Sequence, residues 1–145
     1  MLNKKDLGGV SPLAYISSPY AGNVRLHLRW ARAMCLYAMN RGYAPFASHL
    51  IYTQFLADTN AEHRSWGIRA GLDVLKRSQC CFMLVDSLPV GGQVFSLQDI
   101  LGQLSAGQLL DYDWARKFGV PITLVTIREI ELLFPKLILP FWCKA

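Results

Sequence analysis

The sequence predicts a single α/β domain in which helices cover both faces of a mainly parallel sheet. Short apolar runs alternate along the chain with longer segments in which apolar residues recur at helical spacing. The 145 residues fit one domain and are too few for two. Hydrophobic residues make up 52% of the chain and charged residues only 17%, so we expect one well-filled core over residues 1–145 and exclude disorder.

The first expected strand and helix lie near the start of the chain. Residues 13–17 form an apolar run that ends in turn residues, as a buried strand does. From 23 to 40 apolar residues recur at helical spacing, and Gly42 follows as a stop signal. Residues 17–23 are therefore a loop that leads from a strand into a helix.

The middle of the chain repeats this order. Residues 43–47 predict a second strand, 48–56 a short helix capped by Ser48, and 62–76 a longer helix. Residues 80–85 are six apolar residues in succession, the clearest strand in the sequence. We expect this strand at the centre of the sheet because its pattern is that of a strand buried on both faces.

The last third of the chain adds another strand. The weak pattern of 87–104 predicts a loop with one helical turn, whereas 106–118 predicts a helix that ends at Gly119. Residues 122–126 predict a strand that Pro121 opens. Alternating strands and helices require right-handed crossovers, so we expect a three-layer Rossmann-like (flavodoxin-like) fold with a roughly five-stranded parallel sheet.

Charge and composition exclude several classes of partner. The net charge of +5 favours an anionic ligand, but no zinc finger, RNA-binding aromatic motif or long Lys/Arg run occurs, so we expect a small phosphorylated ligand and no stable nucleic-acid partner. No apolar run reaches the roughly 18 residues that span a bilayer, and no apolar stretch follows Lys4 and Lys5. We therefore expect a cytoplasmic protein without a membrane partner.

No metal or other cofactor is expected. The histidines lie in no HExxH or H-x-E pattern, and the cysteines follow no CxxC spacing, so the thiols are expected to be reduced core residues. These cysteines are Cys35, Cys80, Cys81 and Cys143.

The residues that follow each strand are the candidates for a binding site, because ligands of parallel sheets bind beyond the carboxyl ends of the strands. After the first strand, a helix N-terminus favours an anion, although an ordinary turn capped by Asn23 explains the pattern equally well. Arg25, in the first helical turn, can reach a ligand at this loop. The loop candidates are Ser17, Ser18, Pro19, Tyr20 and Asn23.

Other candidates follow the second and third strands. His49 either touches the ligand or caps a helix, and Asp86 ends the central strand. Four aromatic side chains can stack on a base, although such residues more often belong to the core. They are Tyr15, Tyr20, Tyr52 and Trp66.

One carboxylate is the best candidate for chemistry. Acids in turns, tails and exposed helix faces are set aside, which leaves Asp86, Asp99, Asp111 and Asp113. Asp111 lies one turn inside the 106–118 helix, so its carboxylate can face the crevice, whereas Asp113 points elsewhere.

Residues 105–115, SAGQLLDYDWA, followed by GVPI at 119–122, resemble the signature of the nucleoside 2-deoxyribosyltransferases. In that family a Gly precedes the nucleophilic Glu by four residues, an Ala follows four residues later, and Gly-x-Pro comes after the helix. Gly107, Asp111 and Ala115 match this spacing. The segments YISSPY (15–20), YAPFASH (43–49) and RSWGI (64–68) resemble small uncharacterised phage and bacterial relatives. The resemblance covers residues 15–126.

This resemblance implies cleavage of a nucleoside or nucleotide N-glycosidic bond, or deoxyribosyl transfer, with Asp111 as the nucleophile. The ligand is expected between residues 17–23 and the start of the 105–118 helix, with a phosphate near Arg25 or Arg64. The binding residues expected in addition to the loop candidates are Tyr15, Arg25, His49, Arg64, Asp86, Ser105, Gly107 and Gln108.

The chain also departs from the family pattern. Asp111 is one methylene shorter than Glu, and Ser105 and Gly71 stand where the family has acids. A group must still protonate the leaving base, and Tyr20, His49 and Asp86 are the candidates. An enzyme therefore remains one possibility. The alternative is a non-catalytic protein that binds a nucleotide or sequesters a nucleotide signal, and a phage is one source of such a protein.

The C-terminal residues 132–145 contain more apolar groups than a surface tail needs, and Pro135 and Pro140 prevent one long helix. We expect a homo-oligomer that buries them; the alternative is that they extend the core of a monomer. The apolar residues are Leu132, Leu133, Phe134, Leu137, Ile138, Leu139, Phe141 and Trp142.

Overall fold

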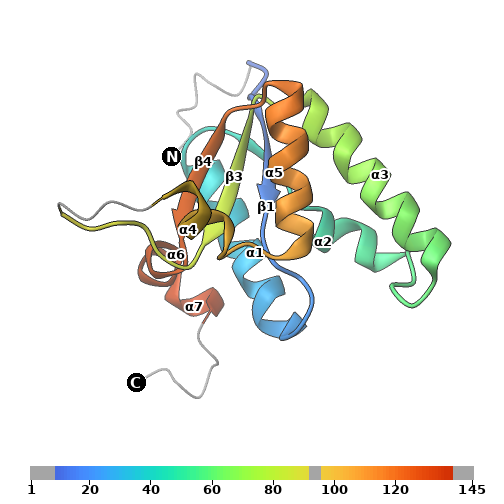
Figure 1. Ribbon diagram of the computed structural model, residues 1–145, viewed down its shortest axis with the longest axis horizontal. Coiled ribbons are helices and arrows are strands. Elements are labelled where there is room, and N and C mark those ends of the chain that lie inside the picture. Colours follow the sequence, from blue (N-terminus) through green and yellow to red (C-terminus); the bar gives the residue numbers. More distant parts are fainter. Residues whose placement is uncertain (1–8, 92–95, 139–145) are drawn as a thin grey trace.

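The computed structural model describes residues 9–91 and 96–138 and contains one parallel sheet (Figure 1). Its strands are β1 (Leu13–Ser17), β2 (Ala44–Phe46), β3 (Cys80–Val85) and β4 (Ile122–Thr126), in the order β2-β1-β3-β4. Every neighbouring pair is parallel. The expected Rossmann-like α/β class and the expected central position of β3 are therefore confirmed, and β1 is the other central strand.

The described residues form four strands, so the expected number of roughly five was too high. After β4 the side chain of Thr126 accepts a hydrogen bond from the backbone N–H of Glu129 at 3.1 Å and so caps a helix. The chain continues as α6 (Ile127–Leu133) and α7 (Pro135–Ile138). The apolar residues after β4 are thus helical within the described range, except for Phe134, which separates the two helices, and residues 139–145 of the expected oligomerisation tail lie outside it.

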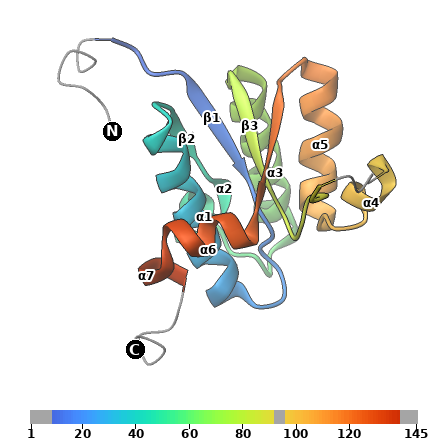
Figure 2. The same ribbon diagram turned by 90° about the vertical axis from the view of Figure 1, so that its left-hand side faces the viewer.

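Helices cover both faces of the sheet (Figure 2). On one face lie α1 (Val24–Asn40) and α6; on the other lie α3 (Ala61–Arg77) and α5 (Ala106–Phe118). Successive side chains of a strand point to opposite faces. Accordingly the β3 residues are buried in two separate clusters: Cys80, Phe82 and Leu84 pack on the α1 side, and Cys81, Met83 and Val85 on the α3–α5 side.

Capping residues define where the long helices begin and end. Asn23 caps α1 by accepting from the N–H of Leu26, Asn60 caps α3, and Ser105 forms a capping box with Gln108 at the start of α5. Gly119 ends α5 with a φ of 72°, a conformation that favours glycine. The Asn23 cap, one of the two explanations of this loop drawn from the sequence, is present.

Two shorter helices lie in the connections. In α2 (Ser48–Ile51) the cap is Ala47, not Ser48 as expected, because Ser48 is already helical and its hydroxyl hydrogen-bonds to Tyr15 instead. A 3₁₀ turn (Tyr52–Gln54) follows. In the weakly patterned segment before α5, α4 (Leu97–Leu101) supplies the expected single helical stretch, while residues 92–95 lie outside the described range. No described helix has both the length and the apolar character to span a membrane.

Candidate active site

Gln108 joins the start of α5 to the carboxyl ends of the two central strands. Its amide nitrogen donates to the carbonyl of Leu84 at 2.7 Å and to that of Ser17 at 3.3 Å. Its amide oxygen accepts from the backbone N–H of Ser105 at 3.1 Å, and the residue is only 2% exposed. Both donors and the acceptor of this side chain are thus used within the protein. The position of α5 relative to β1 and β3 follows from these bonds.

Asp111 lies three residues further along α5 and its carboxylate contacts β1. Oδ2 accepts from the hydroxyl of Ser17 at 2.7 Å, and Oδ1 accepts from the hydroxyl of Tyr15 at 3.3 Å. Tyr15 and Ser17 are two residues apart on a strand, so both side chains point to the α5 face. Both oxygens of the carboxylate are therefore oriented by β1.

Burial changes the acidity of this pair. It raises the pKa of Asp111 to about 6, although the hydrogen bonds from Ser17 and Tyr15 oppose the rise. Burial and the nearby Asp111 raise the pKa of Tyr15 well above its ordinary value, so the phenol keeps its proton and remains a donor. At neutral pH the Asp111 carboxyl is mostly ionised. A carboxyl with a raised pKa beside a cavity is characteristic of functional sites.

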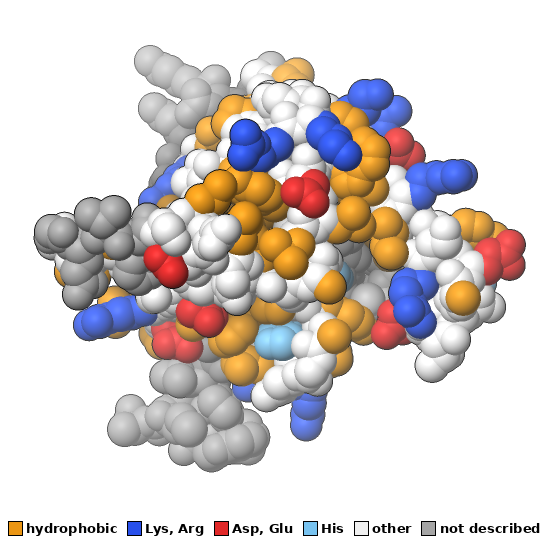
Figure 3. Space-filling model, in the orientation of Figure 1, with side chains coloured by type: hydrophobic (Ala, Val, Ile, Leu, Met, Phe, Trp, Pro, Cys, Tyr) orange, Lys and Arg blue, Asp and Glu red, His pale blue; other side chains and the backbone are white. Residues whose placement is uncertain are grey.

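Asp111 lines a cavity of about 190 Å³ enclosed by α2, α3 and the first turns of α5. In Figure 3 the surface is hollowed between α5 and α3, with basic and acidic side chains beside the hollow. Of the residues expected at the site, Tyr15, Tyr20, His49, Arg64, Gly107 and Asp111 line this cavity. The structure thus brings together residues from β1, the loop after it, α2, α3 and α5.

His49 forms one wall of the cavity together with Tyr20. The two rings stack with centroids 4.9 Å apart and planes at 21°, and Nε2 of His49 lies 3.0 Å from the carbonyl of Ser18. A carbonyl only accepts hydrogen bonds, so this contact assigns the ring proton to Nε2. Burial lowers the pKa of His49. The ring is therefore neutral at pH 7, with a lone pair on Nδ1.

Other expected site residues lie outside the cavity wall. Asn23 caps α1, Arg25 is exposed on that helix, and Asp86 is exposed just after β3. Ser105 and Gln108 form the capping box described above. Ser18 is buried, and its hydroxyl has no hydrogen-bond partner among the described residues, while Pro19 is half-buried in the same loop.

Sequence reasoning placed Arg64 of α3 at the site but did not predict that two glycines of this helix line the cavity. Gly67 and Gly71 lie one helical turn apart on the side of α3 that faces it. A Cβ added at Gly71 would come within 3.3 Å of the Tyr15 hydroxyl, so glycine lets α3 approach the Tyr15–Asp111 pair. The two glycines four residues apart in the sequence were the available signal. Tyr52, one of the aromatic candidates from the sequence, also lines the cavity, as do Ser48, Thr53 and Asp58.

A parallel sheet covered on both faces, with a cavity at its carboxyl edge that Asp111 lines, defines a Rossmann-like α/β protein. Among solved structures, a 2-deoxyribosyltransferase from the psychrotolerant bacterium Bacillus psychrosaccharolyticus matches with a TM-score of 0.56 and 14% identity, over 78% of this chain and 71% of that one. Within this fold class, the chain belongs to the family described as a domain of unknown function, DUF7768, whose model matches residues 12–92. A search of curated proteins finds no match.

The two comparisons cover different parts of the site. The structural match relates this chain to a 2-deoxyribosyltransferase at the level of the fold, as the sequence resemblance implied. The family match includes β1, α2 and α3, and thus Tyr15, His49 and Arg64, but it ends before α5. The family description therefore says nothing about Asp111.

Proposed function

We propose that this protein cleaves or exchanges the N-glycosidic bond of a nucleoside or nucleotide, with Asp111 as the nucleophile. The observation that carries the proposal is a carboxylate held by Ser17 and Tyr15 in the wall of a cavity that also contains the stacked Tyr20 and His49 rings. The carboxylate supplies the nucleophile, and the aromatic wall can contact a base.

In this reaction an oxygen of Asp111 forms a bond to the anomeric carbon while the bond from that carbon to the base breaks. The electron pair of the broken bond leaves with the base, which takes up a proton. Water or a second base then displaces the carboxylate from the sugar. Oδ1 is the better placed nucleophile, because its 3.3 Å bond from Tyr15 is longer than the 2.7 Å bond that holds Oδ2.

The cavity favours one of the three proton donors expected from the sequence. Asp86 is exposed and does not line the cavity, and neutral His49 presents a lone pair rather than a proton on Nδ1. The Tyr20 hydroxyl remains, from a side chain that lines the cavity and stacks on His49. We assign proton donation to Tyr20 and acceptance of a hydrogen bond from the base to His49 Nδ1.

The test is release of free base. Deoxynucleosides, ribonucleosides and their 5′-monophosphates are incubated with the protein and separated by chromatography. Wild-type protein should release base, and Asp111→Asn should not, because the amide keeps the shape of the side chain but is not a nucleophile. Asp113→Asn is the matched control, since Asp113 is an exposed carboxylate two residues further along the same helix.

A binding protein is the second candidate. It is favoured by the two hydrogen bonds that already occupy both oxygens of Asp111, which also suit a carboxylate that only orients a ligand. Base release no faster in wild type than in Asp111→Asn, together with measurable nucleotide binding by both, would establish this alternative.

A further inference from the structure

A second hollow of about 620 Å³, here called the α3–α5 groove, adjoins the active-site cavity. It follows α3 from Ala61 to Lys76 and reaches Trp114 and Phe118 on α5. Arg64, Ile68 and Leu72 belong to the walls of both hollows, so the two are neighbours. The function proposed above does not use this groove.

The active-site cavity is too small for a large ligand. Its volume of about 190 Å³ lies below the roughly 300–1,000 Å³ of pockets that enclose a drug-sized molecule. A nucleotide that places its anomeric carbon at Asp111 must therefore extend beyond the cavity. Arg64 is exposed and lines both hollows, and its Nη2 donates to the carbonyl of Asp58 at 3.4 Å, so this residue stands where a ligand would leave one hollow and enter the other.

The α3–α5 groove carries an excess of positive charge. Arg64, Arg69 and Lys76 line it, against the single acid Asp73. All four residues are exposed, and within the described part of the chain Arg69 and Lys76 form no ion pair. Lys76 lies 12 positions after Arg64, which corresponds to about 18 Å along the helix. Phosphate groups along this length would meet cations at both ends and between them.

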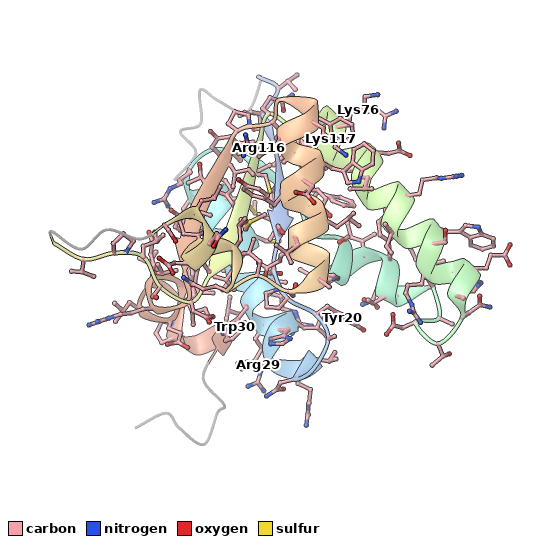
Figure 4. All side chains as sticks on the ribbon, in the orientation of Figure 1. Tyr20, Arg29, Trp30, Lys76, Arg116 and Lys117 are labelled. Carbon is pink, nitrogen blue, oxygen red and sulfur yellow. The ribbon has the colours of Figure 1, made fainter. Side chains whose placement is uncertain are left out.

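The far end of the groove is an aromatic platform. The rings of Trp114 and Phe118 stack at 5.2 Å, with Nζ of Lys117 4.7 Å from the Trp114 centroid and Nζ of Lys76 5.6 Å from that of Phe118. Figure 4 labels both lysines at the C-terminal ends of their helices. Aromatic rings next to ammonium groups suit a planar base linked to a phosphate.

We propose that the α3–α5 groove binds the second nucleotide of a bis-nucleoside pyrophosphate whose first nucleoside occupies the active-site cavity. The pyrophosphate lies along Arg64 and Arg69, and the second base lies against Trp114 and Phe118. This inference rests on the proposed function for the placement of the first nucleoside. It deepens that function by defining the substrate class as dinucleotides rather than single nucleosides.

The test compares the affinities of diadenosine pyrophosphate and AMP by titration calorimetry at low and physiological salt. Wild-type protein should bind the dinucleotide at least roughly tenfold more tightly, because the second half binds intramolecularly. Arg69→Ala/Lys76→Ala should remove this advantage while leaving the affinity for AMP unchanged. The matched control is Arg32→Ala/Arg128→Ala, which removes two exposed cations from α1 and α6. Both variants change surface residues only, so the fold should persist.

The platform is tested separately. Trp114→Ala should weaken binding of the dinucleotide and leave that of AMP unchanged. Trp114→Phe retains an aromatic ring, so it should keep most of the wild-type affinity for the dinucleotide. Equal wild-type affinities for the two ligands, or an advantage that survives in Arg69→Ala/Lys76→Ala, would overturn the inference.

Failure of the inference can be told from failure of the proposed function. If base release depends on Asp111 but the protein shows no preference for the dinucleotide, the proposed role of the groove is wrong and the proposed glycosidic chemistry is supported. A groove-dependent preference without base release would support the groove and overturn the chemistry.

Discussion

The hydroxyl of Ser17 lies 2.7 Å from Oδ2 of Asp111, although 94 positions separate the two residues. The contact exists because β1 directs Ser17 toward α5 and because Gln108 bonds the first turn of that helix to the carbonyl of Ser17 itself. One residue of β1 thus supplies both the anchor for the helix and the donor for the carboxylate. The predictions below test the parts of this arrangement.

Replacement of Asp111 by Asn should stabilise the fold at neutral pH. The pKa of Asp111 is about 6 when folded and 3.8 in its ordinary state, so folding disfavours the ionised form. The neutral carboxyl contributes its full stability below pH 4, and that contribution is lost as the pH rises through 6, up to about 3 kcal/mol. The free energy of unfolding in urea is measured for both proteins at pH 4 and pH 8. The variant's value relative to that of wild type should be higher at pH 8 than at pH 4. Asp113→Asn should show no such gain.

The activity should have an acid limb set by Asp111. Only the ionised carboxylate is a nucleophile, so kcat/KM should fall about tenfold per pH unit below pH 6. In Ser17→Ala the pKa of Asp111 should rise, because the hydrogen bond that lowers it is gone, and the limb should move to higher pH. Initial rates from pH 4.5 to 8.5 measure this. If kcat/KM of Ser17→Ala falls at the same pH as that of wild type, a group other than Asp111 controls the pH dependence of the rate.

Gln108→Leu should destabilise the protein by about 2–5 kcal/mol. The substitution leaves the carbonyls of Ser17 and Leu84 and the N–H of Ser105 without their buried partner. Chemical denaturation measures the loss. Gln98→Leu, an exposed position on α4, is the control and should change the free energy of unfolding by less than about 0.5 kcal/mol. If Gln108→Leu lowers the free energy of unfolding no more than Gln98→Leu does, the hydrogen bonds of Gln108 do not hold α5 against the strands.

Gly107→Ala should lower activity without lowering stability. A Cβ at this position would meet no atom within 4 Å, and alanine favours a helix by up to about 1 kcal/mol over glycine. Because Gly107 lines the cavity, the added methyl group would occupy space that the ligand needs. Thermal melting and KM are measured together. An unchanged KM would place the ligand away from the start of α5.

Self-association remains a prediction. On α6 the side chains of Leu132 and Leu133 are 72% and 54% exposed, and such apolar groups are buried when copies of a chain associate. Light scattering at micromolar concentration should give a mass well above the 16.3 kDa of one chain. Leu132→Ser/Leu133→Ser should shift the protein toward the monomer. A wild-type mass near 16 kDa would show a monomer.

The positions of the long elements follow from the sequence because local pattern determines them. The apolar run of β3, the helical spacing of α1, α3 and α5, and the caps Asn23 and Gly119 depend on neighbours a few residues away. For the same reason Asp111 could be selected from the sequence: its depth within α5 is a local property.

Only the tertiary structure decided which residues accompany Asp111. The cavity forms where α3 and α5 pack beside β1. This packing brings Arg64 to the cavity wall but not Arg25, and it places Gly71 next to the Tyr15 hydroxyl. The residues that form these contacts are far apart in the sequence and leave no periodic signal. Chain order and hydrophobic spacing thus determined which elements form, whereas packing of their side chains across the sheet decided which functional groups meet.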